Sequence, residues 1–109
     1  MKWIYRDVFA VLTIGMFLLS TTRSQAQDAK ALYQSKCAMC HGADGKGETP
    51  IGKKTDVHDF ASADVKKQSD ADLEQVTKKG KNKMPAYDGK LKDSEIKDLV
   101  AYIRQLGKQ

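Results

Sequence analysis

The chain is poor in the residues that build closed metal sites and disulfide frameworks. Its 109 residues include two cysteines, two histidines and two prolines. A structural zinc site needs four ligands, and His58 is the only histidine outside the stretch that holds both cysteines. A disulfide between Cys37 and Cys40 would close a very small ring and stabilise little. A thioredoxin-like dithiol would need a β-strand before the pair, which the sequence does not predict.

Aromatic residues are also scarce. The single tryptophan, two of the three phenylalanines and one of the four tyrosines lie within the first 26 residues. Residues 27–109 keep 16 lysines and arginines against 13 aspartates and glutamates, a net charge of +3. That charge is too mild for a nucleic-acid-binding protein, and no pattern of basic and aromatic residues supports one. A domain this small makes a thin core, so a covalently held apolar group would stabilise it.

The N-terminal residues have the pattern of a secretory signal peptide. Lys2 and Arg6 supply the basic start, an apolar stretch covers residues 8–19, and Ser24-Gln25-Ala26 offers small residues at a cleavage site. The apolar stretch is shorter than the roughly 20 residues that span a bilayer, which argues against a stable membrane anchor. We therefore predict a cleaved signal peptide over residues 1–26, export to the periplasm in soluble form, and one domain over residues 27–109.

The sequence Cys37-Ala38-Met39-Cys40-His41 is the most informative stretch of the chain. Two cysteines three positions apart, followed directly by histidine, are the arrangement that attaches a c-type haem. Cys37 and Cys40 lie about one helical turn apart, so both sulfurs can reach the two vinyl groups on one porphyrin edge. His41 can then present its imidazole to the haem iron. Export agrees with this interpretation, because covalent attachment needs reduced thiols that meet haem outside the cytoplasm.

Hydrophobic spacing predicts an all-α chain. A first helix is expected over residues 28–37, capped by Asp28, and a short helical turn over residues 62–65. A last helix is expected to begin near Lys92 or Asp93 and to end before Gly107. Its apolar face is formed by Ile96, Leu99, Val100, Ile103 and Leu106.

A further helix is predicted over residues 70–79. Ser69 can serve as its N-cap, and Asp72 stands three residues later as a short version of the capping box. Leu73 and Val76 are expected to face inward. Gly80 follows as a natural terminator.

The pair Met84-Pro85 supplies a candidate for a second axial ligand of the iron. A methionine thioether is the usual partner of histidine in electron-carrying c-type haems. Met1 and Met16 leave with the predicted signal peptide, and Met39 lies between the two haem cysteines. Met84 therefore remains as the candidate, and Pro85 stiffens the backbone just after it.

The order of helix, Cys-x-x-Cys-His motif, glycine-rich loop, helix, Met-Pro loop and terminal helix resembles a class I monohaem cytochrome c of the small bacterial periplasmic type. The resemblance covers essentially all of residues 27–109. It implies an all-α fold of three to five short helices wrapped around one haem c, attached through Cys37 and Cys40. It also implies that the first and last helices cross, packing Ala29 and Tyr33 against Leu99 and Tyr102.

The resemblance assigns roles to further residues. Pro50 is the candidate whose carbonyl accepts a hydrogen bond from the second ring nitrogen of His41, the alternative being an ordinary turn. Tyr87 matches an aromatic residue that shields the haem. Residues 52–68 form a shorter loop than in mitochondrial relatives, and no tryptophan remains to bond a haem propionate. His58, in this polar loop, is expected to lie on the surface instead of binding iron.

The expected function is a diffusible, monomeric carrier of single electrons without enzymatic activity, because axial ligation by His41 and Met84 excludes substrate from the iron. Lysines near the Met-Pro loop would attract an acidic docking surface on a redox partner. They are Lys78, Lys79, Lys81, Lys83, Lys90 and Lys92, with Lys53 and Lys54 as further candidates. Two alternatives stay open: an electron-entry subunit of a dehydrogenase or oxidase complex, and an open-iron haem sensor or peroxidase.

Overall fold

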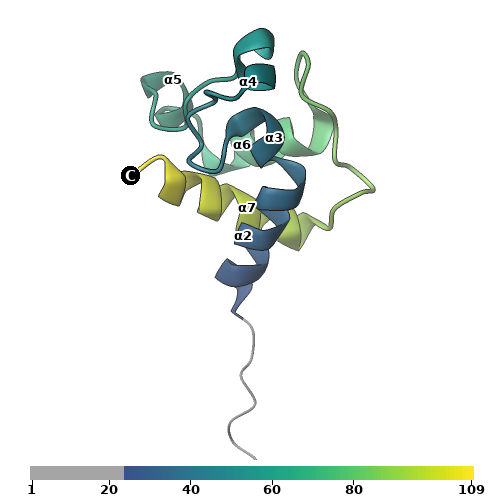
Figure 1. The fold of residues 1–109 in the computed structure, drawn as a ribbon. Helices are drawn as coiled ribbons and strands as arrows, with labels where there is room; N and C mark the ends of the chain where they lie inside the picture. The colour runs from purple at the N-terminus through teal and green to yellow at the C-terminus, as the bar shows by residue number, and fades with distance from the viewer. Residues whose placement is uncertain (1–23) are drawn as a thin grey trace, which may run out of the picture.

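The structure is a computed structural model that describes residues 24–109 (Figure 1). The predicted signal peptide lies outside these residues, apart from its last three positions. The described chain forms six helices and no β-strand, and none of these helices is long and apolar enough to cross a membrane. The all-α prediction is confirmed. Six helical segments replace the expected three to five, and two of them are single turns of four residues.

The core lies where α2 (Gln25–Lys36) crosses α7 (Asp93–Leu106) (Figure 1). Tyr33 of α2 is completely buried, and its ring centroid lies 5.2 Å from that of Tyr102 on α7. Leu99 belongs to the same buried cluster. The predicted packing of Tyr33 against Leu99 and Tyr102 is therefore confirmed, and it joins the two ends of the domain.

Helix α2 begins earlier than the sequence predicts. Its N-cap is Ser24, whose Oγ accepts a hydrogen bond from the backbone N–H of Gln27 at 3.3 Å. The predicted cap, Asp28, instead lies in the first turn, where its charge complements the helix dipole. The prediction was wrong because Gln25, Ala26 and Gln27 are good helix formers that extend the helix towards the N-terminus.

Helix α6 (Asp70–Lys79) confirms the predicted bounds and cap. The backbone N–H of Asp72 donates to Ser69 Oγ at 3.1 Å, and that of Ser69 donates to Asp72 Oδ2 at 3.3 Å. Leu73 and Val76, expected to face inward, are half-buried, whereas Thr77 is the buried residue of this helix. The polar Thr77 can be buried because its hydroxyl donates to the carbonyl of Leu73 at 2.8 Å.

The glycine-rich loop over residues 42–47 lies between two short helices that the sequence did not predict. Helix α3 (Ala38–His41) is a single turn that follows α2 directly, and α4 (Pro50–Thr55) follows the loop. Thr49 caps α4 and Pro50 occupies its first turn, a pair that is favourable at a helix start because proline needs no N–H partner there.

A single arginine fastens the middle of the chain to α7. The Nε of Arg104 donates to the Asp70 carboxylate at 2.9 Å, and its Nη1 donates to the carbonyl of Val65 at 3.1 Å. Its Nη2 donates to the carbonyl of Gln68. These bonds hold the end of α5 (Ala63–Lys66) and the start of α6 against the terminal helix.

Candidate haem site

The two cysteines lie at the junction of α2 and α3. Cys37 ends the first helix and begins the second, and its backbone N–H donates to the carbonyl of Tyr33 at 2.8 Å. Both thiols are half-buried and free of a disulfide. Burial, with a smaller contribution from Cys40, raises the pKa of the Cys37 thiol to about 11. Neither sulfur is bonded to the other, so both could form thioether bonds to a porphyrin edge.

The side chain of His41 is poised to bind a metal ion. Burial lowers its pKa, which favours the neutral imidazole that ligates metals. Its ring stacks on Phe60, with 4.9 Å between centroids and an interplanar angle of 23°. The Nδ1 atom is buried and has no hydrogen-bond partner among the described residues. A buried imidazole nitrogen left without a partner is costly, and Nδ1 is the ring nitrogen that the sequence assigns to a hydrogen bond with a backbone carbonyl. A neutral imidazole beside two free thiols fits a haem in donor type.

Met84 closes a tight turn after α6. Its backbone N–H donates to the carbonyl of Lys81 at 2.9 Å, and the N–H of Lys81 donates to the carbonyl of Met84 at 3.2 Å. Asn82 adopts the left-handed conformation that this turn requires. A Cβ at Gly80 would lie 2.7 Å from the carbonyl oxygen of Met84, so only glycine allows the chain to pass this closely. The backbone of the half-buried Met84 is thus restrained by its hydrogen bonds to Lys81 and by the close approach of Gly80.

Tyr87 joins this turn to the haem motif. Its hydroxyl donates to the carbonyl of Lys36, the residue before Cys37, at 3.1 Å. Its backbone N–H donates to the carbonyl of Thr77 on α6 at 3.2 Å. Partial burial, followed by the charges of Cys37 and Cys40, raises the pKa of the Tyr87 hydroxyl. The structure therefore brings Tyr87 close to the cysteine pair.

Pro50 is exposed and begins α4. The carbonyl that the sequence assigns to it is not paired with His41, since the Nδ1 of His41 has no partner within residues 24–109. That role stays a prediction. His58 is exposed, in line with its expected place on the surface.

Two of the lysines around the Met84 turn are engaged in ion pairs, which the sequence did not predict. Lys78 pairs with Asp93 and Lys79 pairs with Asp88, each at 3.1 Å. The Lys79 hydrogen bond and charge hold the pKa of Asp88 below its usual range. Lys90 lies over the Tyr87 ring at 5.9 Å from its centroid.

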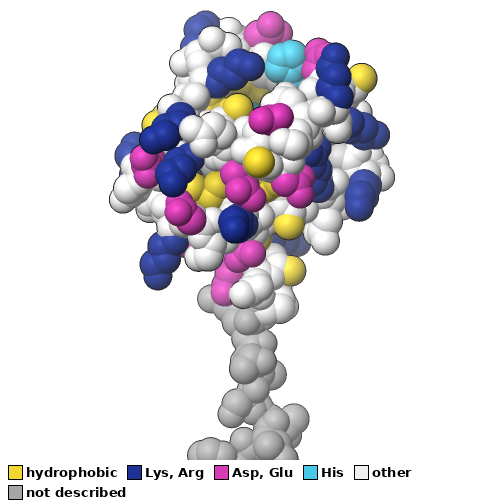
Figure 2. All heavy atoms as spheres, turned by 180° about the vertical axis from the view of Figure 1, so that it is seen from behind, with side chains coloured by type: hydrophobic (Ala, Val, Ile, Leu, Met, Phe, Trp, Pro, Cys, Tyr) yellow, Lys and Arg dark blue, Asp and Glu magenta, His cyan; other side chains and the backbone are white. Residues whose placement is uncertain are grey.

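The exposed Lys81 and Lys83 make no ion pair within the described part of the chain. Figure 2 shows acidic and basic side chains interspersed over the face opposite that of Figure 1.

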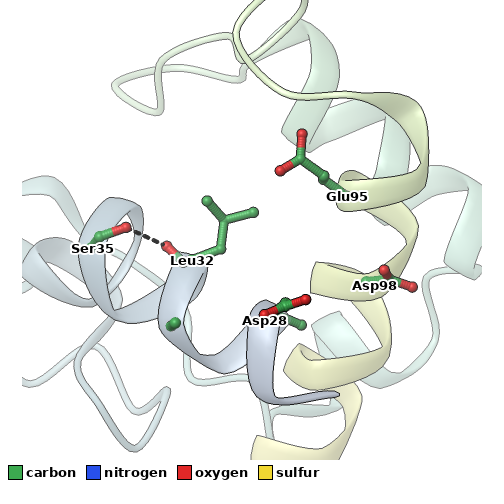
Figure 3. Close-up of a pocket in the computed structure, with 7 residues that line it drawn as sticks. Asp28, Leu32, Ser35, Glu95 and Asp98 are labelled. Atoms are coloured by element: carbon green, nitrogen blue, oxygen red, sulfur yellow. Dashed lines mark hydrogen bonds between the residues drawn. The ribbon is translucent and has the colours of Figure 1, made fainter. Parts of the chain in front are cut away.

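A shallow hollow of about 300 Å³ lies elsewhere, between α2 and α7 (Figure 3). Leu32 lies on its α2 side, and the carboxylates of Glu95 and Asp98 approach from α7. None of the haem-motif residues lines it. The hollow is therefore separate from the candidate haem site.

Sequence reasoning missed two residues that support the haem motif. Thr49 donates its hydroxyl hydrogen to the carbonyl of Cys40 at 2.7 Å, and Tyr33 donates to the carbonyl of Gly42 at 2.6 Å. Burial, with smaller contributions from charges that include Cys37, raises the pKa of Tyr33. The Thr49-Pro50 pair is typical of a helix start, and it was the one local signal that could have drawn attention to Thr49. No local signal indicates the hydrogen bond from Tyr33 to Gly42.

Comparison with known proteins places this geometry in a family. Residues 24–103 match the family model described as "Cytochrome C oxidase, cbb3-type, subunit III". The chain is 33% identical to cytochrome c6 of Nostoc over an alignment of 114 positions, gaps included, which covers 99% of this chain and 95% of that protein. It is 34% identical to the cbb3-type cytochrome c oxidase subunit FixPc of Rhizobium leguminosarum, over 75% of this chain and 28% of that subunit.

A solved structure agrees. The KustC0563 c-type cytochrome superposes with a TM-score of 0.66 at 31% sequence identity, over 72% of this chain and 95% of that one. The chain thus spans less than a third of the FixPc subunit but nearly the full length of cytochrome c6. Proteins of this type carry a c-type haem on a Cys-x-x-Cys-His motif, and Cys37 and Cys40 attach it here. The chain therefore belongs to the cytochrome c family, as a small helical domain similar to cytochrome c6 and to part of the cbb3-type oxidase subunits.

Proposed function

We propose that this protein is a periplasmic one-electron carrier whose haem iron is bound by His41 and Met84. The observation that carries the proposal is the pairing of the haem motif with one suitable methionine on a restrained turn. Met39 is 72% exposed between the two cysteines, whereas Met84 is half-buried on a loop tied to the residue before Cys37.

The haem supplies the one-electron couple of its iron. The surrounding residues would hold that group. Phe60 packs against one face of the His41 ring, and Tyr87 fastens the Met84 loop to the haem motif. Filled axial positions leave no place for a substrate at the iron, so the protein has no enzymatic activity of its own in this proposal.

The partner would be a redox protein with an acidic docking surface. Lys81 and Lys83 extend from the Met84 turn without ion pairs in the described chain. Exposed lysines of this kind accelerate encounter with an acidic surface and act weakly once the complex has formed. The protein would be exported by its N-terminal signal peptide, cleaved near Ala26, and would act as a monomer.

A second function has specific support from the family match: the chain would be the electron-entry domain of a cbb3-type oxidase. The model for that family matches residues 24–103, and FixPc is a subunit of such an oxidase. In this case the domain would stay in a membrane-bound complex and pass electrons within it.

Fractionation of cells expressing the full chain separates the two functions. The carrier proposal predicts that most of the haem protein is released with the periplasm, elutes as a monomer, and has the mass of residues 27–109 with one haem. Retention in the membrane together with oxidase subunits would overturn it in favour of the second function. An unprocessed mass would contradict the predicted signal peptide alone.

A further inference from the structure

Three successive backbone carbonyls around His41 accept hydrogen bonds from Tyr33 on α2 and from the loop over residues 45–49. The carbonyl of Cys40 accepts from the Thr49 hydroxyl at 2.7 Å, and that of His41 accepts from the Gly47 N–H at 2.8 Å. The carbonyl of Gly42 accepts from the Tyr33 hydroxyl at 2.6 Å and from the Gly45 N–H at 3.1 Å. These carbonyls need outside donors because α3 ends at His41, and the last carbonyls of a helix have no partner within it.

The bonds fix both peptide planes that meet at His41. A peptide group is planar, so holding its oxygen holds the whole plane. The Cys40 carbonyl belongs to the plane before the His41 Cα, and the His41 carbonyl belongs to the plane after it. Thr49 and Gly47 thus restrain the direction in which the His41 side chain leaves the backbone. Tyr33 restrains the next plane, where Gly42 turns the chain with a φ of +83°.

The side chains of Thr49 and Tyr33, which donate two of these bonds, are restrained by further contacts. Thr49 Oγ1 accepts a hydrogen bond from the backbone N–H of Gly52 at 2.8 Å. A Cβ at Gly52 would lie 2.4 Å from the carbonyl oxygen of Cys40, so this approach requires glycine. Tyr33 is completely buried in the α2–α7 core, and its ring packs edge-on against Phe60, which stacks on the His41 ring.

We propose that Tyr33 and Thr49 are positioning residues that set the orientation of the His41 imidazole at the haem iron. This inference rests on the proposed axial role of His41. The two hydroxyls act on the backbone on either side of the histidine, whereas Phe60 restrains its ring. Loss of the Thr49 hydroxyl would release the peptide plane before His41. Loss of the Tyr33 hydroxyl would leave the Gly42 carbonyl held by the Gly45 N–H alone. Either change would alter the orientation of the imidazole without removing a proposed iron ligand.

The variants Tyr33→Phe and Thr49→Val remove one hydroxyl each and keep nearly the same shape. Thr49→Ser keeps the hydroxyl and tests rescue. Tyr102→Phe is the matched control for the tyrosine, because Tyr102 packs on Tyr33 and no hydrogen bond of its hydroxyl occurs in the described residues. Thr55→Val is the control for the threonine, since the Thr55 hydroxyl donates only to the carbonyl of Ile51 in its own helix.

The readout is the proton NMR spectrum of the oxidised holoprotein, because the haem methyl shifts of the ferric form report the imidazole orientation. We expect Tyr33→Phe and Thr49→Val to change the pattern of methyl shifts beyond the change in either control, and Thr49→Ser to restore the parent pattern. Parent-like methyl shifts in both variants, with only a lower thermal midpoint, would overturn the inference. If Thr49→Val gives no holoprotein, Tyr33→Phe and Thr49→Ser decide the question alone.

Failure of the proposed function looks different. It would appear in the unmodified protein as a haem without histidine ligation, before any variant is compared. Normal ligation in the parent with unchanged methyl shifts in the variants would reject the positioning role only.

Discussion

The hydroxyl of Tyr87 donates to the carbonyl of Lys36, 51 residues earlier in the chain, at 3.1 Å. Lys36 immediately precedes the first haem cysteine, and Tyr87 follows Met84 by three positions. One hydrogen bond thus connects the two segments that we propose hold opposite faces of the haem. It gives the Met84 loop an anchor other than the methionine itself.

Removal of this bond should loosen the Met84 loop. A hydrogen bond of this kind contributes about 1 kcal/mol, so Tyr87→Phe should let added imidazole displace the methionine at a roughly fivefold lower concentration. Titration with imidazole, followed in the visible spectrum, measures the effect. Tyr102→Phe serves as the control, and equal imidazole affinity in all three proteins would contradict the anchoring role.

Arg104 should contribute more to stability than the surface ion pairs. Arg104→Lys keeps the charge but cannot make the three directed bonds to Asp70, Val65 and Gln68. We expect it to lower the free energy of unfolding by about 1–2 kcal/mol. Lys67→Ala, which breaks an exposed pair with Asp64, should cost less than about 0.5 kcal/mol. Urea unfolding of the holoprotein measures both variants. Equal losses of unfolding free energy would show that the Arg104 hydrogen bonds stabilise the fold no more than a surface ion pair does.

Electron transfer to an acidic partner should depend on salt through Lys81 and Lys83. Raising the ionic strength from about 0.01 M to about 0.2 M should slow the second-order rate about tenfold, because salt screens charge attraction. Lys81→Gln and Lys83→Gln should each reduce the low-salt rate more than Lys30→Gln, which lies on α2. Stopped-flow kinetics measures these rates. A rate that is flat with ionic strength would remove the proposed docking role.

The reduction potential should be clearly positive. A thioether ligand favours ferrous iron, and an apolar, water-excluding shell also raises the potential. An equilibrium redox titration should show a single one-electron transition above the hydrogen electrode. A negative midpoint would argue against ligation by Met84.

Elements with strong local signals could be predicted from the sequence. The Cys37–His41 motif identified the cofactor, and the Ser69–Asp72 capping box located α6 correctly. The start of α2 was misplaced because Ser24 caps the helix from within the predicted signal peptide. Helix α4 was missed because its six residues are too few for a periodic apolar pattern, which left Thr49-Pro50 as the only signal.

Contacts between distant segments could not be predicted in the same way. The bond from Tyr33 to Gly42 and that from Tyr87 to Lys36 join residues that no local spacing relates. The ion pairs of Lys78 and Lys79 likewise depend on how α6 packs beside the segment that follows it. Such contacts depend on the folded backbone. This explains why the sequence did not show that Lys78 and Lys79 are in ion pairs.

The most direct test of the proposed function is the visible absorption spectrum of the oxidised, periplasmically expressed protein. Ligation by His41 and Met84 predicts a low-spin spectrum with a weak sulfur-to-iron charge-transfer band at the red end. That band should vanish in Met84→Ala and persist in Met39→Leu, the matched control on the exposed methionine. A high-spin spectrum without the band in the unmodified protein would contradict the carrier proposal and favour an open iron that binds gas or peroxide.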